Sequence, residues 1–241
     1  MIALMKDDLN FVASRIPRDI RELMKERGLF LAGGFIRSTI AGEKPSDLDL
    51  FGPSLDMLEN CALKLTTDRK GRFHTSDNAF TVLSPPRMPV QFIHRWLYEF
   101  TPEGADKLLS EFDFTIAQAM IWRDDKGWHS LASERFYPDL AARRLVYTFP
   151  QRIEDAGGSL LRVRKFLSKG YNIQAPSLGG VVARIAMAVR WNDLYDSDGQ
   201  TRERMAAKVI TGLIREVDPL AIVDGIDTID KHEVVTEEGR P

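Results

Sequence analysis

Residues 29–37 read LFLAGGFIR and residues 47–51 read DLDLF, and these two stretches decide the fold. The first is an apolar run ending in two glycines, typical of a buried strand that turns into a helix. In the second, strand alternation puts Asp47 and Asp49 on one face, while the leucines between them point into the core. Two carboxylates this close repel each other, and a hard cation such as Mg²⁺ relieves the repulsion. The sequence therefore predicts a magnesium site at a strand end.

The glycine pair predicts a partner for that metal. Because Gly33 and Gly34 lack a Cβ, backbone N–H groups at the turn can approach phosphate oxygens. The turn leads into the start of a helix, which favours anions. Metal and phosphate binding would then come from one short segment.

The two motifs, in this order and spacing, resemble the signature of the DNA polymerase beta superfamily of nucleotidyltransferases. Further downstream, EFDFTIAQA at 111–119 resembles a segment of the head domain of tRNA nucleotidyltransferases and bacterial poly(A) polymerases. The dipeptide DL at 139–140 and the basic stretch LLRVRKF at 160–166 are similar to later parts of that family. The resemblance covers about residues 28 to 172.

This resemblance implies transfer of a nucleoside monophosphate from an NTP to a hydroxyl group, with Mg²⁺-dependent release of pyrophosphate. A two-metal site is implied, with the NTP as substrate. The implied roles are metal binding and catalysis by Asp47 and Asp49, and nucleotide binding by Gly33, Gly34, Arg37, Asp113 and Arg162.

Three positions depart from the family pattern. Ser38 stands where the family has an aspartate after the arginine, and Gln91 stands where the tRNA enzymes carry a third carboxylate. Gln91 can hydrogen-bond a metal-bound water but brings no charge. Ser159 takes the place of an arginine that reads the base. Base choice therefore stays open.

Composition excludes several classes of protein. The chain has 241 residues, of which 44% are hydrophobic and 28% charged, so it can bury a substantial core. No apolar run approaches the roughly 20 residues needed to span a bilayer, and the acidic start does not fit a signal peptide, so we expect no membrane partner and a cytoplasmic location. The single cysteine, Cys61, excludes an intrachain disulfide. A formal net charge of −2 means that any RNA contact must come from local patches.

The pattern of apolar residues predicts a chain of helices and short strands. Together with the resemblance, this implies an α/β (α+β) fold: a nucleotidyltransferase head with a short mixed sheet flanked by helices, followed by a smaller helical segment. We expect a head domain at 1–150 and a helical segment with a polar, acidic tail at 151–241. Predicted helices cover 5–27 (in two pieces), 34–41, 55–65, 103–110 and most of 153–224. Predicted strands cover 30–32, 47–51, 73–75, 79–83 and 89–94.

The acceptor of the nucleotide is not fixed by the sequence. An RNA 3′ end, such as that of a tRNA, is the first choice, and a protein side chain or a small molecule is the alternative. A catalytically silent relative that binds a nucleotide or a partner protein is a third hypothesis. The basic residues Arg162, Arg164 and Lys165 either face phosphates or form a solvated helix face. The NTP used and the oligomeric state are open.

Overall fold

The structure is a computed structural model that describes residues 1–99, 101–150, 156–194 and 199–217. The chain divides into two compact units, Met1–Ala142 and Arg143–Pro241. The first unit contains every predicted site residue except Arg162.

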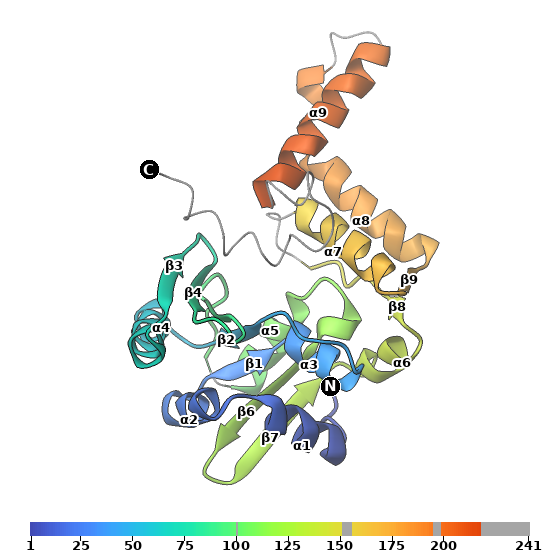
Figure 1. Cartoon of the computed structure of the whole chain (residues 1–241). Coiled ribbons are helices and arrows are strands. Elements are labelled where there is room, and N and C mark those ends of the chain that lie inside the picture. Colours follow the sequence, from blue (N-terminus) through green and yellow to red (C-terminus); the bar gives the residue numbers. More distant parts are fainter. Residues whose placement is uncertain (100, 151–155, 195–198, 218–241) are drawn as a thin grey trace. The chain divides into compact units, whose positions relative to one another are not determined.

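The first unit consists of a mixed sheet with helices on both faces (Figure 1). Its helices are α1 (Lys6–Arg15), α2 (Arg18–Arg27), α3 (Gly34–Ile40), α4 (Leu55–Arg69), α5 (Pro102–Ser110) and α6 (Phe136–Ala141), with a 3₁₀ turn η1 (Thr115–Ala117). Its strands are β1 (Phe30–Ala32), β2 (Leu48–Phe51), β3 (Arg72–Thr75), β4 (Ala79–Leu83), β5 (Val90–Ile93), β6 (Ala119–Asp124) and β7 (Gly127–Ala132).

The seven strands lie in the order β3-β4-β5-β2-β1-β6-β7. The β2–β5 pair is parallel, and all other neighbours are antiparallel. Strand β2 is the central strand of the seven, so the site at its start lies in the middle of the sheet.

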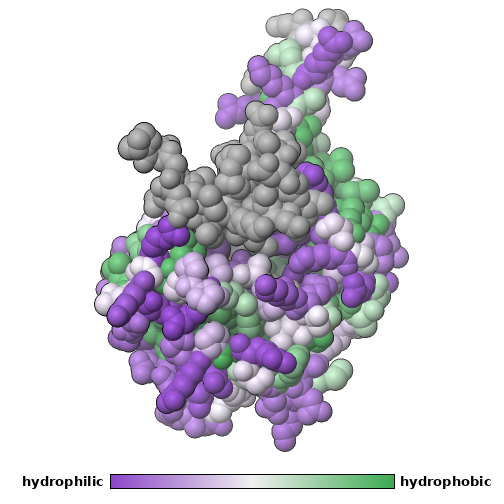
Figure 2. Space-filling model, viewed as in Figure 1, coloured by the Kyte–Doolittle hydropathy of each residue, from purple (hydrophilic) through white to green (hydrophobic). Residues whose placement is uncertain are grey.

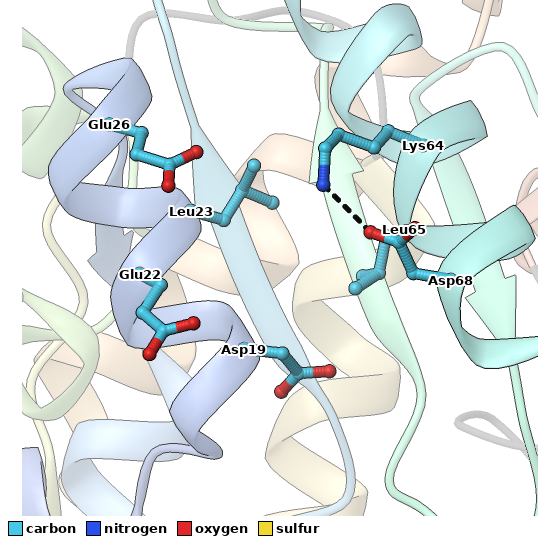
Figure 3. A pocket seen from close by; sticks show the side chains of 7 residues that line it. All are labelled: Asp19, Glu22, Leu23, Glu26, Lys64, Leu65 and Asp68. Carbon is cyan, nitrogen blue, oxygen red and sulfur yellow. Dashed lines mark hydrogen bonds and ion pairs between the residues drawn. The ribbon is translucent and has the colours of Figure 1, made fainter.

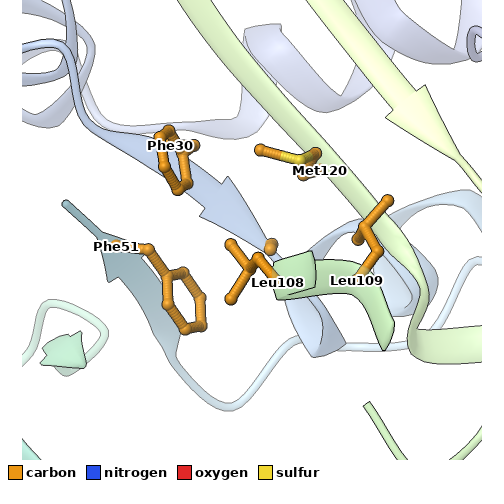
Figure 4. Packing of buried hydrophobic residues seen from close by; sticks show 6 residues of the cluster. Phe30, Phe51, Leu108, Leu109 and Met120 are labelled. Carbon is orange, nitrogen blue, oxygen red and sulfur yellow. The ribbon is translucent and has the colours of Figure 1, made fainter. Parts of the chain in front are cut away.

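The two faces of the sheet are covered by different helices. On one face, Phe30, Phe51 and Met120 pack against Leu108 and Leu109 of α5 (Figure 4). Because side chains alternate along β2, the fully buried Leu48 and Leu50 point to the other face. That face is covered by α2, which packs against β6, and by α4, which packs against β3, β4 and β5.

Local sequence explains where these helices begin and end. Gly28 ends α2 in the left-handed conformation, at φ 62° and ψ 37°. The Ser54 hydroxyl accepts a hydrogen bond from the Met57 amide and caps α4. Thr101 caps α5 in the same way, with Pro102 at the first helical position.

The second unit is mainly helical. It comprises the short parallel strands β8 (Arg144–Leu145) and β9 (Asn172–Ile173), the helices α7 (Ala156–Ser168), α8 (Ala175–Ala188) and α9 (Gly199–Val217), and a 3₁₀ turn η2 (Trp191–Leu194). Helix α7 packs against both α8 and α9.

The predicted fold class is confirmed: a mixed sheet flanked by helices precedes a smaller helical unit. Cys61 is buried. Helix α4 continues to Arg69, beyond the predicted end at 65, and the elements β6, β7 and α6 were not predicted. The predicted acidic tail from 225 lies outside the described residues. Within the described part of the chain, no helix combines the length and apolar character that crossing a membrane would take.

Candidate functional site

The candidate site lies where β1 ends and β2 begins. These strands are antiparallel, with Leu31 opposite Leu50. The turn that follows β1, at Gly33 and Gly34, is therefore at the same end of the sheet as Asp47, which directly precedes β2. The topology thus brings together the two motifs that the sequence separates by a helix.

The two aspartates are accessible rather than packed in the core. Asp47 and Asp49 are both half-buried, whereas Leu48 between them is fully buried. The Ser46 hydroxyl donates a hydrogen bond to Asp47 Oδ1 over 3.1 Å. Two partly exposed carboxylates on one face of a strand end can reach a ligand from solvent.

Gln91 lies directly beside Asp49. In the parallel β2–β5 pair Asp49 is opposite Gln91, and neighbouring strands are about 4.8 Å apart. Opposite residues in paired strands point to the same face, so the Gln91 amide and the Asp49 carboxylate share a face. The family resemblance puts Gln91 at the place of a third carboxylate, and its role at the site stays a prediction.

The same row of residues continues across the sheet. Gln91 is opposite Thr81 on β4, and Thr81 is opposite His74 on β3. Thr81 is 1% exposed and Gln91 is 7% exposed, so two polar side chains are buried on the face of the candidate site. Thr81 is not among the predicted site residues; the sequence signals it only as one polar residue within the apolar run AFTVL of β4.

Gly33 and Gly34 have different structural roles. Gly33 adopts φ 82° and ψ −129°, and a Cβ there would lie 2.8 Å from the ring of Phe112. Its amide donates to the Ala119 carbonyl, so this N–H is already used within the fold. Gly34 begins α3, and no atom lies within 4 Å of the place where its Cβ would be. Gly33 therefore shapes the turn, and Gly34 leaves open space at the start of α3.

Arg37 is buried on α3. It is 7% exposed, and its Nη2 donates to the Ser38 hydroxyl over 2.7 Å. In the family that the sequence resembles, an aspartate stands at the position of Ser38. In this protein the Ser38 hydroxyl, and not a carboxylate, contacts Arg37. Helix α3 joins β1 to the turn before β2, so Arg37 lies on the segment between the two motifs.

Asp113 lies close to the glycine turn. Its neighbour Phe112 contacts Gly33, and Asp113 itself is 3% exposed, between α5 and η1. Arg162 lies on α7 in the second unit, half-buried. The strand pairing brings the glycine turn, Asp47, Asp49 and Gln91 to one end of the sheet, and the roles of all the predicted site residues stay predictions.

The donor set fits Mg²⁺ in its chemistry. Asp47, Asp49 and Gln91 offer hard oxygen atoms on one face, and Mg²⁺ is typically held by one or two carboxylates, with water and phosphates completing its coordination. Within the described residues, no group of three or more His, Cys, Asp or Glu side chains could hold a metal ion. A cation at this site would therefore depend on a bound nucleotide for further ligands.

A separate groove of about 100 Å³ lies on the other face of the sheet, between α2 and α4 (Figure 3). On α2, the groove is lined by the carboxylates of Asp19, Glu22 and Glu26. On the facing helix α4, Lys64 Nζ and Asp68 Oδ2 form an ion pair at 2.7 Å. This groove lies on the face away from Asp49 and is not part of the candidate site.

A family model described as "Gad2: Gabija anti-defense 2 family protein" matches residues 3–143. The matched range covers nearly the whole first unit and therefore every candidate residue on the sheet. No curated protein matches the chain in sequence.

Several solved structures have a similar fold. The Thermotoga maritima CCA-adding enzyme complexed with tRNA matches with a TM-score of 0.55 and 17% identity, over 95% of this chain and 56% of that one. A CCA-adding enzyme in complex with CTP matches with a TM-score of 0.57 and 17% identity, over 95% of this chain and 55% of that one. A CCA-adding enzyme in complex with ATP matches with a TM-score of 0.54 and 18% identity, over 91% of this chain and 55% of that one. The chain thus spans about half the length of these enzymes, and at such identity the likeness concerns the fold.

Proposed function

The chain belongs to the Gabija anti-defense 2 family, and from this premise we propose that it is a metal-dependent nucleotidyltransferase. The proposed reaction transfers a nucleoside monophosphate from an NTP to a hydroxyl group. The acceptor oxygen forms a bond to the α-phosphorus, the bond from that phosphorus to the β-phosphate oxygen breaks, and pyrophosphate leaves.

One observation carries this proposal. The register places Gln91 beside Asp49, on the face that Asp47 shares, at the sheet end where the Gly33–Gly34 turn starts α3. Oxygen ligands for a cation and space for phosphates thus meet at one place. The fold shared with enzymes solved in complex with CTP and ATP supports the same interpretation.

Each residue has a defined task in this proposal. Asp47 and Asp49 would hold Mg²⁺, and the Gln91 amide would hydrogen-bond a water of its coordination shell. When bound, Mg²⁺ lowers the pKa of the acceptor hydroxyl and stabilises charge on the transferred phosphoryl group. The open start of α3 at Gly34 receives the β and γ phosphates, and Arg37 offsets their charge. Asp113 orients the sugar.

The acceptor is proposed in two forms. An RNA 3′ end is supported by the shared fold, because one structure of that fold is a complex with tRNA. A hydroxyl on a protein is supported by the family description, which names an antagonist of a defence called Gabija. A nucleotidyltransferase could oppose this defence by transferring a nucleotide to one of its protein components.

A labelling experiment tests the proposal and distinguishes these acceptors. The full chain is incubated with each α-labelled NTP, Mg²⁺ and extract from cells that carry Gabija, and from matched cells that lack it. Label that RNase removes supports the RNA end, and label that protease removes supports the protein acceptor. Absence of label in both extracts contradicts nucleotidyl transfer and favours a silent relative that only binds nucleotide.

A further inference from the structure

Helix α8 is apolar on all sides. From Ala175 to Val189 its sole charged residue is Arg184, and Arg184 Nη1 donates to the Pro150 carbonyl over 3.0 Å. One side of the helix is buried through Ser177, Gly180, Val181 and Ile185. A helix that is hydrophobic all round is normally covered on all sides. The side of α8 that is exposed among the described residues is therefore a candidate contact surface for a partner.

The uncovered side is what we call the outer face of α8: Leu178, Gly179, Val182, Ala183 and Met187. Val182 is 54% exposed and Met187 is 86% exposed. Neither α7 nor α9, both packed against each other in this unit, covers these side chains. In the space-filling view, hydrophobic surface gathers over the part of the molecule where α8 lies (Figure 2).

Phe149 enlarges this apolar surface. Its ring is 65% exposed, and a Cβ on Gly180 would lie 2.7 Å from it, so the ring rests directly on α8. Phe149 also has a positive φ of 54°, which is unfavourable for a bulky residue. The contact between its ring and the helix holds an aromatic side chain in the solvent beside the outer face.

We propose that the outer face of α8 binds the same face of a second copy of this chain, forming a two-fold symmetric dimer. Two arguments favour a second copy. In a two-fold interface both copies present the same surface, so a charged residue near the axis would face a like charge. The outer face of α8 contains no charged residue. The face also has complementary shape: Leu178 and Val182 form a ridge, and Gly179 and Ala183 beside it leave a groove that can receive the partner's ridge.

The exposed apolar area limits the size of the interface. The exposed apolar side chains of the outer face and Phe149 present on the order of 500 Å² per copy, so a pair would bury about 1,000 Å², where specific interfaces begin. We therefore expect a reversible dimer with a dissociation constant of about micromolar order.

Sedimentation of the full chain from ~1 to ~200 µM tests the dimer. The expected result is a shift from one to two copies with rising concentration. Val182→Glu places two carboxylates near the axis and should raise the dissociation constant by about a hundredfold or more. Leu63→Glu is the matched control, because Leu63 is 45% exposed on α4 in the first unit. It should leave the dimer unchanged.

A cysteine cross-link provides a second test that keeps the face apolar. Cys61 is the sole native cysteine and is buried, so an introduced thiol reports on its own position. Val182→Cys should form a disulfide between two copies under mild oxidation, and Leu63→Cys should not. A chain that stays monomeric at all concentrations, or a dimer that Val182→Glu leaves intact, overturns the proposal. In the first case the face is covered by something other than a second copy.

Discussion

Gln91 is the residue at which the candidate site differs most from three-carboxylate sites. It is buried beside Asp49 and carries no charge, so the cation would be held by two negative side chains. A site with less negative charge binds a divalent cation more weakly. The expected consequence is a high Mg²⁺ requirement, which one substitution can reduce.

Gln91→Glu should lower the Mg²⁺ concentration for half-maximal label transfer by about tenfold, because it adds a carboxylate next to the metal ligands. Gln91→Leu, which keeps the volume but removes the amide, should raise that concentration. The measurement is a Mg²⁺ titration of transfer for the three proteins. Identical titration curves would show that Gln91 does not face the metal.

The glycine pair offers a stability test at single residues. Gly33→Ala should destabilise the fold by about 2–4 kcal/mol, because the backbone at this position has a positive φ and the added methyl group would collide with the Phe112 ring. Gly34→Ala should change the free energy of unfolding by less than about 1 kcal/mol, since its Cβ would meet no neighbour within 4 Å. Urea unfolding of both variants measures this, and equal effects would contradict the structural difference between the two glycines.

At the scale of elements, the sequence predicted most of the first unit. The apolar strands β1, β2, β4 and β5 and the cap at Gly28 could be predicted because alternation and turn residues mark them locally. Strand β7 escaped prediction because its side chains are nearly all half-buried and show no alternation. The pairing of Asp49 with Gln91 could not be derived either, since strand register depends on contacts between distant segments.

An ion pair links two of these elements. Arg69 at the end of α4, with a side chain 2% exposed, donates to both carboxylate oxygens of Asp19 on α2, at 2.7 and 3.1 Å. Burial of Asp19 opposes its charge, but the hydrogen bonds and charge of Arg69 outweigh this effect and hold the Asp19 pKa below its ordinary value. A lowered carboxyl pKa stabilises the fold above the pKa of the unfolded chain, and this contribution is lost as the pH falls through the folded pKa.

Asp19→Asn should therefore reduce the change in the free energy of unfolding with pH in the acid range. The variant should be less stable than the native chain by about 1 kcal/mol near neutral pH, a value reduced for the partial exposure of Asp19, and the difference should vanish in strong acid. Thermal unfolding across the acid range measures it. Glu22→Gln removes the solvent-exposed ion pair with Arg18 and serves as the control with a smaller effect. A difference that persists unchanged in acid would contradict the pairing.

At the scale of the whole molecule, the family match covers the first unit and leaves the helical second unit without a shared description. The second unit carries the basic residues of α7, and it also carries the outer face of α8.

Arg162→Glu should weaken nucleotide binding at low salt by about tenfold, with the loss shrinking as salt rises, if its guanidinium neutralises a phosphate. Arg164 is the control, because it is exposed two residues along the same helix and points to another side. Binding of a fluorescent NTP across a salt series measures both variants. If both bind as the native chain does, α7 is a structural helix.

The most direct test of nucleotidyl transfer compares the native chain with Asp47→Asn and Asp49→Asn in the labelling reaction. Both side chains are half-buried at a strand end, so the variants should keep their folded circular dichroism spectrum and melting temperature. Loss of one carboxylate from a two-carboxylate site should lower the rate of label transfer and pyrophosphate release by about a thousandfold. Folded variants that transfer label at the native rate would contradict catalysis at this site.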